Sequence, residues 1–182
     1  YPTQGIASYI SVSGNYAYLV DYDNGLMIID ISDPKAPTIT GQYNLENIHG
    51  VAVSGNYAYL ISDGLKIVDI SNPAEPTLAG SYYTSVSTRG VAVSGSYAYV
   101  VDDYEGLVVV DISNPATPIF AGRYDMTGYV RDITISENYA YVTRYDNGLA
   151  IIDVSNPSEP ELVANYDTAG EAYGVAISGN HA

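Results

Sequence analysis

Ser54-Gly55-Asn56-Tyr57-Ala58-Tyr59 decides the fold, because this stretch returns along the chain. Ser13 to Tyr18 repeats it without change, and Ser94 to Tyr99 and Ser136 to Tyr141 each differ from it at one position. Ser178-Gly-Asn-His-Ala182 begins a fifth copy. The copies start 41, 40, 42 and 42 residues apart. Such a period indicates a repeat architecture, in which each unit buries its apolar surface by stacking on its neighbours.

Each repeat contains four strand signals. In the second copy, Gly55-Asn56 and Ser62-Asp63-Gly64 are tight-turn sequences between apolar runs. Pro73 and Pro76 then interrupt the chain, because proline cannot donate to a strand ladder. The predicted strands are 51–54, 57–61, 65–69 and 77–82. Four short antiparallel strands in this period predict an all-β fold, a β-propeller built of four-stranded blades.

The faces of the strands support this fold. Leu107 to Val110 and Leu149 to Ile152 are apolar at every position, so both faces of each sheet must be covered by neighbouring sheets. A solenoid is the competing geometry, but its repeats usually have fewer strands and are shorter. We expect one array over 1–182, with blades near 10–50, 51–90, 91–132 and 133–174. Residues 175–182 are expected to form the first strand of a further blade.

The third strands share one sequence pattern, which is followed each time by Ile/Val-Ser-Asn/Asp-Pro-x-x-Pro. These strands are Leu26–Asp30, Leu65–Asp69, Leu107–Asp111 and Leu149–Asp153. The pattern closely resembles the LVIVD-repeat family over essentially the whole chain. The resemblance implies a β-propeller of the kind carried by secreted or surface-attached bacterial and archaeal proteins. It implies no catalytic residues.

Composition narrows the possible partners. The net charge is −15, from 21 acidic and 6 basic residues, so the surface repels nucleic acid and anionic membranes. No apolar stretch approaches the roughly 18 residues of a membrane span. The chain has no cysteine, which excludes disulfides and thiolate metal sites. Twenty tyrosines with few lysines favour an extracellular or cell-surface location.

Residues that recur in every copy are predicted to be scaffold. Asp30, Asp69, Asp111 and Asp153 precede the Ser-Asn/Asp-Pro turn and are expected to accept its backbone N–H groups. The paired tyrosines, such as Tyr57 and Tyr59, are expected to pack between blades. The hairpins cluster acidic oxygens that suit calcium, at Asp21, Asp23, Asp102, Asp103 and Glu105. These hairpin sequences lack a full set of calcium ligands, and they are also typical of ordinary turns. Apart from this calcium hypothesis, no cofactor is expected.

The position before the first strand differs between copies. It holds Ser8, His49, Arg89, Arg131 and Tyr173. In a propeller these residues fall on one circle, near one mouth of the channel. We expect His49, Arg89, Arg131 and Tyr173 to form a site for an acidic peptide or sugar there. The alternative is that each arginine pairs with an acidic neighbour, such as Glu46, Asp103 or Asp132.

The sequence favours a non-enzymatic scaffold that binds a protein or glycan on its loop face, such as a component of a surface layer or filament. His49 and His181 are the only histidines, and no nucleophile–histidine–carboxylate pattern occurs. The alternative is a propeller hydrolase that uses a carboxylate pair near the channel, for which Glu46 and Glu171 have no convincing partner. Four blades are expected to be half of a seven- or eight-bladed ring, completed by more of the chain or by a second copy.

Overall fold

The computed structural model describes residues 5–84, 87–126 and 128–182, and these ranges contain sixteen strands and no helix. The strands form four separate four-stranded antiparallel sheets, each in chain order. Blade 1 consists of β1 (Ala7–Ser13), β2 (Tyr16–Asp21), β3 (Gly25–Asp30) and β4 (Thr38–Tyr43). Blade 2 consists of β5 (Gly50–Ser54), β6 (Tyr57–Ser62), β7 (Gly64–Asp69) and β8 (Thr77–Tyr82). The predicted all-β propeller fold is confirmed.

Blades 3 and 4 repeat the arrangement. Blade 3 consists of β9 (Thr88–Ser94), β10 (Tyr97–Asp102), β11 (Gly106–Asp111) and β12 (Ile119–Tyr124). Blade 4 consists of β13 (Val130–Ser136), β14 (Tyr139–Arg144), β15 (Gly148–Asp153) and β16 (Glu161–Tyr166). The sheets therefore begin one to three residues before the boundaries predicted from the sequence.

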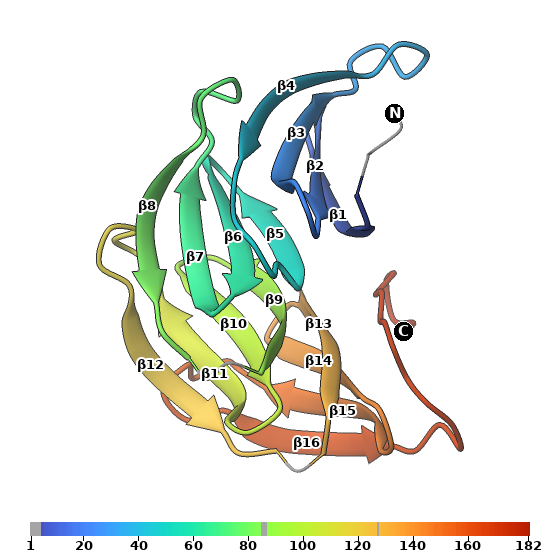
Figure 1. Ribbon diagram of the computed structural model, residues 1–182. Coiled ribbons are helices and arrows are strands. Elements are labelled where there is room, and N and C mark those ends of the chain that lie inside the picture. Colours follow the sequence, from blue (N-terminus) through green and yellow to red (C-terminus); the bar gives the residue numbers. More distant parts are fainter. Residues whose placement is uncertain (1–4, 85–86, 127) are drawn as a thin grey trace.

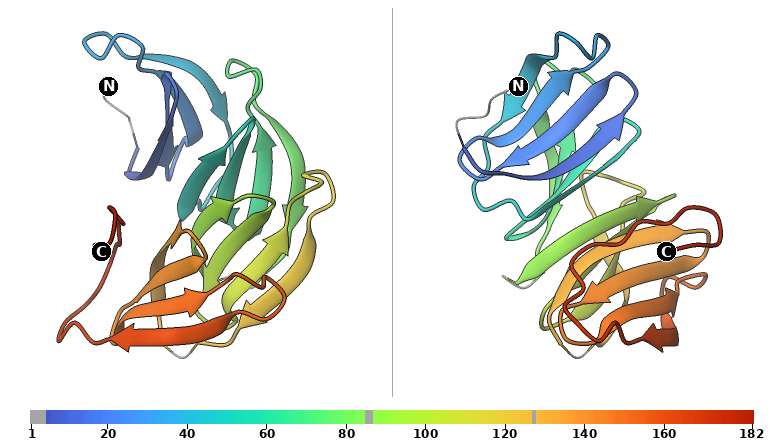
Figure 2. Two further views of the ribbon diagram at one scale, coloured as in Figure 1. Left: turned by 180° about the vertical axis from the view of Figure 1, so that it is seen from behind. Right: turned by 90° about the vertical axis from the view of Figure 1, so that its right-hand side faces the viewer.

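The four blades stand side by side in an open arc (Figures 1 and 2). The first strand of each blade lies on the inner side of the arc and the fourth strand on its outer rim. Along the inner side, β1 contacts β5, β5 contacts β9 and β9 contacts β13. Residues at one point of the repeat therefore lie next to one another around the inner side, as a propeller requires.

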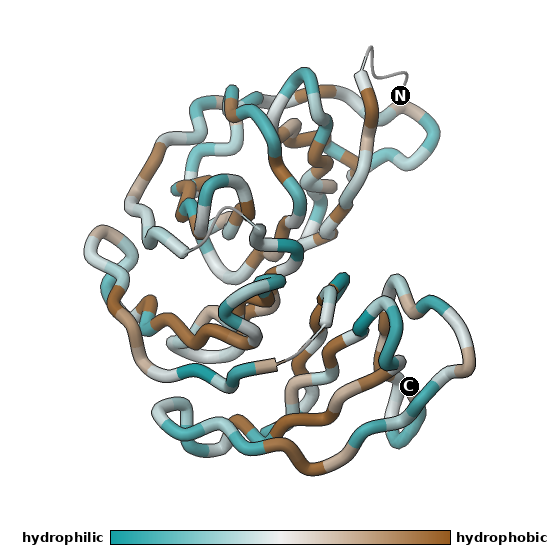
Figure 3. The backbone as a smooth tube through the Cα atoms, turned by 60° about the horizontal axis from the view of Figure 1, so that its bottom comes forward, coloured by the Kyte–Doolittle hydropathy of each residue, from teal (hydrophilic) through white to brown (hydrophobic). Residues whose placement is uncertain are grey.

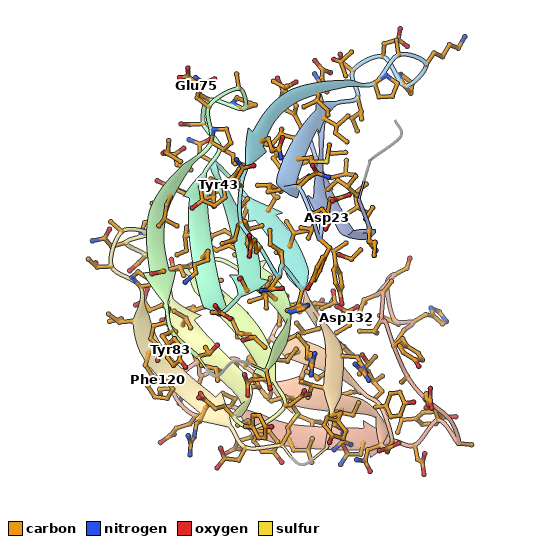
Figure 4. All side chains as sticks on the ribbon, viewed as in Figure 1. Asp23, Tyr43, Glu75, Tyr83, Phe120 and Asp132 are labelled. Carbon is orange, nitrogen blue, oxygen red and sulfur yellow. The ribbon has the colours of Figure 1, made fainter. Side chains whose placement is uncertain are left out.

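Each blade has two ends with different connections. The end that carries the hairpins between second and third strands is called the hairpin face. The opposite end, the proline-loop face, carries the loops between third and fourth strands, where Figure 4 labels Glu75. The turn between first and second strands also lies there, and Gly55 adopts φ 56° in it. Glu137 takes this position in blade 4 with φ 53°, a conformation that costs a residue with a Cβ about 1–2 kcal/mol.

The apolar cores lie between the blades. In Figure 3 the brown, hydrophobic residues lie mostly in the strands and the teal, hydrophilic residues mostly in the loops. Each blade turns one face toward the next blade, and this tyrosine face is formed in blade 1 by Tyr18, Val20, Leu26 and Ile28. Its other face, the aliphatic face, packs on the preceding blade and is formed in blade 2 by Ala58, Leu60, Val68 and Ile70. Equivalent residues form the cores between blades 2 and 3 and between blades 3 and 4.

The two end faces of the arc lack a neighbouring blade. On the aliphatic face of blade 1, Ile10 is 63% exposed, whereas the equivalent Val91 is 8% exposed. The central strands of this face are better covered: Ala17 in β2 and Met27 and Ile29 in β3 are buried, whereas Ile39 in the outer strand β4 is exposed. On the tyrosine face of blade 4, β16 is exposed along its whole length. The exposure of apolar residues is therefore greatest at β1 in blade 1 and at β16 in blade 4, and it is lower on the central strands of both end blades.

Residues 167–182 form a tail that follows β16 back to the inner side of the arc (Figure 1). All of these residues are described, and their only pairing is the isolated bridge between Ser178 and His181. The strand predicted over 175–182 is therefore not formed in this chain. The physical reason is that a strand needs hydrogen bonds to a neighbouring strand, and residues 175–182 pair with none of the described strands.

Candidate functional site

The residues before each first strand lie around the inner side of the arc at its hairpin face. A Cβ built on Gly50 would lie 3.5 Å from the Cα of Gly90, and one built on Gly90 would lie 3.5 Å from the Cα of Asp132. These residues directly follow His49, Arg89 and Arg131 in the sequence. The repeat geometry therefore places the three predicted site residues on neighbouring inner strands, in the region that we call the mouth.

Arg89 is held by an acidic residue of its own blade. Its Nε and Nη2 donate to Oδ2 of Asp103 at 2.8 and 2.6 Å. The Asp103 side chain is 4% exposed, and its Oδ1 accepts the backbone N–H of Val130 at 3.1 Å. Since Val130 belongs to blade 4, Asp103 links blades 3 and 4. For Arg89 the structure shows the alternative considered from the sequence, in which each arginine pairs with an acidic neighbour.

Arg131 lies among aromatic side chains instead. Its guanidinium carbon is 4.8 Å from the ring centroid of Tyr145 and 5.8 Å from that of Tyr173. The two rings meet edge to face, with centroids 5.8 Å apart. Both distances to the cation suit a cation–π contact. The Arg131 Nε is buried and has no hydrogen-bond partner among the described residues.

Glu171 completes this cluster. It accepts a hydrogen bond from the Tyr145 hydroxyl and another, at 2.7 Å, from the Tyr173 hydroxyl. Donation to Glu171 raises the pKa of Tyr145 to about 12, because ionised tyrosine would lose the bond and repel the carboxylate. The two tyrosine hydroxyls, and then the charge of Arg131, hold the pKa of Glu171 below its ordinary value. Arg131, Tyr145, Glu171 and Tyr173 are called the tail clamp below.

The tail clamp sets the middle of the tail beside β13. The Thr143 hydroxyl donates to the Tyr173 carbonyl at 3.2 Å, and the Val175 N–H donates to Oδ2 of Asp132 at 3.2 Å. Figure 4 shows Asp132 on the inner side of the arc, beside the tail. Tyr173 to Val175 therefore occupy the place of the next inner strand, although they are not part of a sheet. Two tyrosine hydroxyls engage Glu171 and two tyrosine rings contact Arg131, and so the clamp fits a structural role for Arg131 and Tyr173.

His49 is half-buried at the same mouth. Its pKa lies below the ordinary value, mainly because burial disfavours the charged imidazolium and also because Arg89 is near. Asp63 opposes this shift. His49 is therefore held toward its neutral form, and adds little positive charge to the mouth.

The acidic hairpin residues serve the turns. Oδ1 of the buried Asp21 accepts the backbone N–H groups of Asp23 and Asn24, at 3.1 and 3.0 Å. The buried Asp102 accepts those of Tyr104 and Glu105, at 2.8 and 3.0 Å. Among the described residues no group of three or more acidic or histidine side chains is arranged to hold a metal ion. The calcium hypothesis for Asp21, Asp23, Asp102, Asp103 and Glu105 gains no geometric support.

The repeated aspartates have the turn role predicted from the sequence. In each blade Oδ1 accepts the backbone N–H of the serine two residues later at 2.8 Å, for Asp30, Asp69, Asp111 and Asp153. These hydrogen bonds lower the pKa of all four carboxyl groups. The inner tyrosines Tyr18, Tyr59 and Tyr99 are each 4% exposed between blades, and burial raises the pKa of each.

Sequence reasoning missed Arg144 and Tyr145. Arg144 stands where the other blades have Asp21, Ser62 and Asp102, and this departure was the available signal. Its Nη2 donates to Oδ1 of Asn165 at 2.6 Å, and its buried Nε has no partner among the described residues. Blade 4 is thus the blade that has a cation at this hairpin position, where blades 1 and 3 have aspartate and blade 2 has serine.

The repeat pattern identifies the family. A model described as LVIVD repeat matches residues 4–45, 47–84, 87–126 and 127–168, which correspond to the four blades. The chain belongs to the LVIVD-repeat family. No curated protein sequence matches this LVIVD-repeat chain. In the described part of the chain, no helix has the length and apolar character needed to cross a membrane.

Solved structures share the fold at low sequence identity. The computationally designed Ika8 protein matches with a TM-score of 0.78 and 12% identity, over 98% of this chain and 54% of that one. A functionally unknown protein from Desulfotomaculum acetoxidans DSM 771 matches with a TM-score of 0.81 and 13% identity, over 97% and 61%. A chain of a Nidogen/Laminin complex matches with a TM-score of 0.64 and 14% identity, over 88% and 63%. The LVIVD-repeat chain spans less than two thirds of each.

Proposed function

We propose that this LVIVD-repeat chain is a non-enzymatic β-propeller scaffold for binding and assembly, located outside the cell or on its surface. The observation that carries the proposal is the pair of apolar end faces. Three apolar cores are enclosed between neighbouring blades, whereas Ile10 on β1 and the apolar residues of β16 are exposed at the two ends of the arc. A face built like an interface and left without a neighbour is a surface for another blade.

The chemistry of the mouth supports a scaffold over a hydrolase. A hydrolase of this kind needs two carboxyl groups free to exchange protons or attack a substrate. Asp103 is buried against Arg89, and Glu171 is occupied by two tyrosine hydroxyls. These two carboxylates are thus engaged in holding blades and tail together. For a protein or glycan partner we propose the hairpin face, because the side chains there differ most between blades.

The end faces are tested by placing a charge on one of them. Ile10→Lys puts a lysine on the aliphatic face of blade 1, where Ile10 is 63% exposed. Phe120→Lys is the matched control, because Phe120 is 52% exposed on β12, at the outer rim of blade 3 (Figure 4). We expect Ile10→Lys to reduce both the binding of an apolar fluorescent dye and concentration-dependent association measured by sedimentation. Equal effects of the two substitutions would show that the end face has no special role.

A further inference from the structure

A glycine in the fourth strand of blades 1, 2 and 3 lies under a loop of the next blade. These residues are Gly41, Gly80 and Gly122. A Cβ built on any of them would lie well under 3.0 Å from a backbone carbonyl oxygen, that of Pro73, Pro115 or Pro157 respectively. None of the three has a positive φ. Glycine is therefore needed at this point for space, because the proline loop of the following blade presses on the strand.

Blade 4 has an alanine at this point. Ala164 pairs with Ile151 just as Gly80 pairs with Ile67, and the same β-bulge interrupts both ladders one residue later. The added methyl group occupies the space that a proline loop takes in the other three interfaces. A backbone carbonyl cannot rotate away as a side chain can, so a blade placed there in the same way would have to shift as a whole.

The first blade of a second copy would bring such a loop. In blade 1 the Ala36 N–H donates to the Asp33 carbonyl at 3.0 Å, and in blade 2 the Glu75 N–H donates to the Asn72 carbonyl at the same distance. The two loops thus contain the same turn, and Pro34 stands where Pro73 does. In a head-to-tail contact with the spacing of the existing interfaces, the Pro34 carbonyl would meet the Ala164 methyl group.

The remainder of this face suits a neighbouring blade. Tyr141, Leu149 and Ile151 match Tyr59, Leu65 and Ile67, which are buried against blade 3, yet in blade 4 they are only half-buried. The position of Val163 holds Thr40, Ala79 and Ala121 in the other blades, so a side chain of similar size to valine occurs there in blade 1. The face is therefore complementary to a blade at most positions and restrictive at Ala164.

We propose that the tyrosine face of blade 4 takes a blade of a different sequence, one whose loop between third and fourth strands leaves room for the Ala164 methyl group. The inference rests on the proposed function, in which end faces take further blades. Ala164 is then a specificity-determining residue that disfavours blade 1 of a second copy. The tail clamp assists, because it holds Tyr173 to Val175 where the first strand of that blade belongs.

The test adds a copy of blade 1 to blade 4 within one chain. Because Ala182 corresponds to Ala17, appending residues 18–49 after Ala182 continues the repeat in phase and supplies the other three strands. Ala164→Gly is introduced into this five-blade chain and into the 182-residue chain. Thermal unfolding gives the midpoints, and amide hydrogen exchange in β15 and β16 reports whether the added blade docks.

We expect Ala164→Gly to shift the unfolding midpoint in opposite directions in the two chains. In the 182-residue chain Ala164→Gly lowers the midpoint by about 1–3 °C, because glycine weakens an exposed strand. In the five-blade chain it raises the midpoint by about 2–6 °C and increases protection of β15 and β16, because the overlap is removed.

Two other results have distinct meanings. If the added blade docks and protects β15 and β16 equally with and without Ala164→Gly, the methyl group fits and the inference is overturned, while the proposed function stands. If the added blade docks in neither version, the end face does not take blades, and the proposed function fails together with the inference.

Discussion

Asp103→Ala should destabilise the protein more than any other loss of an ion pair. The substitution removes the acceptor of the Val130 N–H, which lies in a fully buried residue, and an unsatisfied buried donor costs about 1–3 kcal/mol. It also removes the ion-pair partner of Arg89. Because the Arg89 side chain is 35% exposed, solvent screens the pair, and its loss costs about 1 kcal/mol. The sum is about 2–4 kcal/mol, which for a chain of this size lowers the midpoint by roughly 6–12 °C.

Thermal unfolding followed by circular dichroism measures this change, with urea unfolding as a second measure. The matched control is Asp125→Ala, which removes the Arg123–Asp125 pair, where the N–O distance is 3.0 Å. Those side chains are 53% and 75% exposed, so the expected cost is at most about 0.5 kcal/mol, or less than about 2 °C. A shift for Asp103→Ala no larger than that of the control would refute the reasoning that Asp103 links blades 3 and 4.

Asp111→Asn should make the stability of the protein less sensitive to acid. Folding lowers the pKa of Asp111, so the ionised carboxylate stabilises the folded protein at pH values above the ordinary pKa of 3.8. This stabilisation is lost as the pH falls below that value. Unfolding curves at several pH values would contradict this if both proteins lost stability in parallel. Tyr145→Phe should remove the phenol that titrates near pH 12 and increase amide exchange in the tail, since Tyr145 stabilises the clamp below its ordinary pKa of 10.0 and ceases to do so as pH approaches 12. If the phenol lost in the variant is one that titrates near pH 10 in the unchanged protein, Glu171 does not hold this hydroxyl. Glu137→Gly should raise the unfolding midpoint by about 1–4 °C, because glycine adopts the φ of 53° without strain; a lower midpoint would mean that the Glu137 side chain outweighs the strain.

The blades could be predicted from the sequence because each strand boundary is marked by local chemistry. Turns at Gly55-Asn56 and the prolines of the loops fix where strands end, and apolar residues on both faces require neighbours. The strand expected at 175–182 was wrong for a nonlocal reason. The side-chain pattern of this segment is that of a first strand, but its backbone forms a strand only when it is hydrogen-bonded to a second strand.

The mouth was only partly predictable. Its position followed from the repeat, and pairing of Arg89 with Asp103 was one of the two interpretations considered. The tail clamp joins Tyr145 to Glu171, 26 residues apart, through docking of a segment that no local pattern describes. The sequence shows that Ala164 replaces a glycine found in the other three blades. Only the structure shows why this matters, because it places a proline carbonyl of the next blade over each of those glycines.

The position of the cores between blades, rather than within them, has a consequence for how such genes change length. Copying or losing one whole repeat alters the number of cores by one and leaves every remaining interface with a matching partner, so unequal recombination between repeats is structurally tolerated. The tolerance does not extend to every repeat. A duplicated blade 4 would place Ala164 under the proline loop of its own copy, whereas a duplicated blade 2 would place Gly80 there. An array like this one is therefore expected to tolerate duplication of any of its first three blades better than duplication of the fourth.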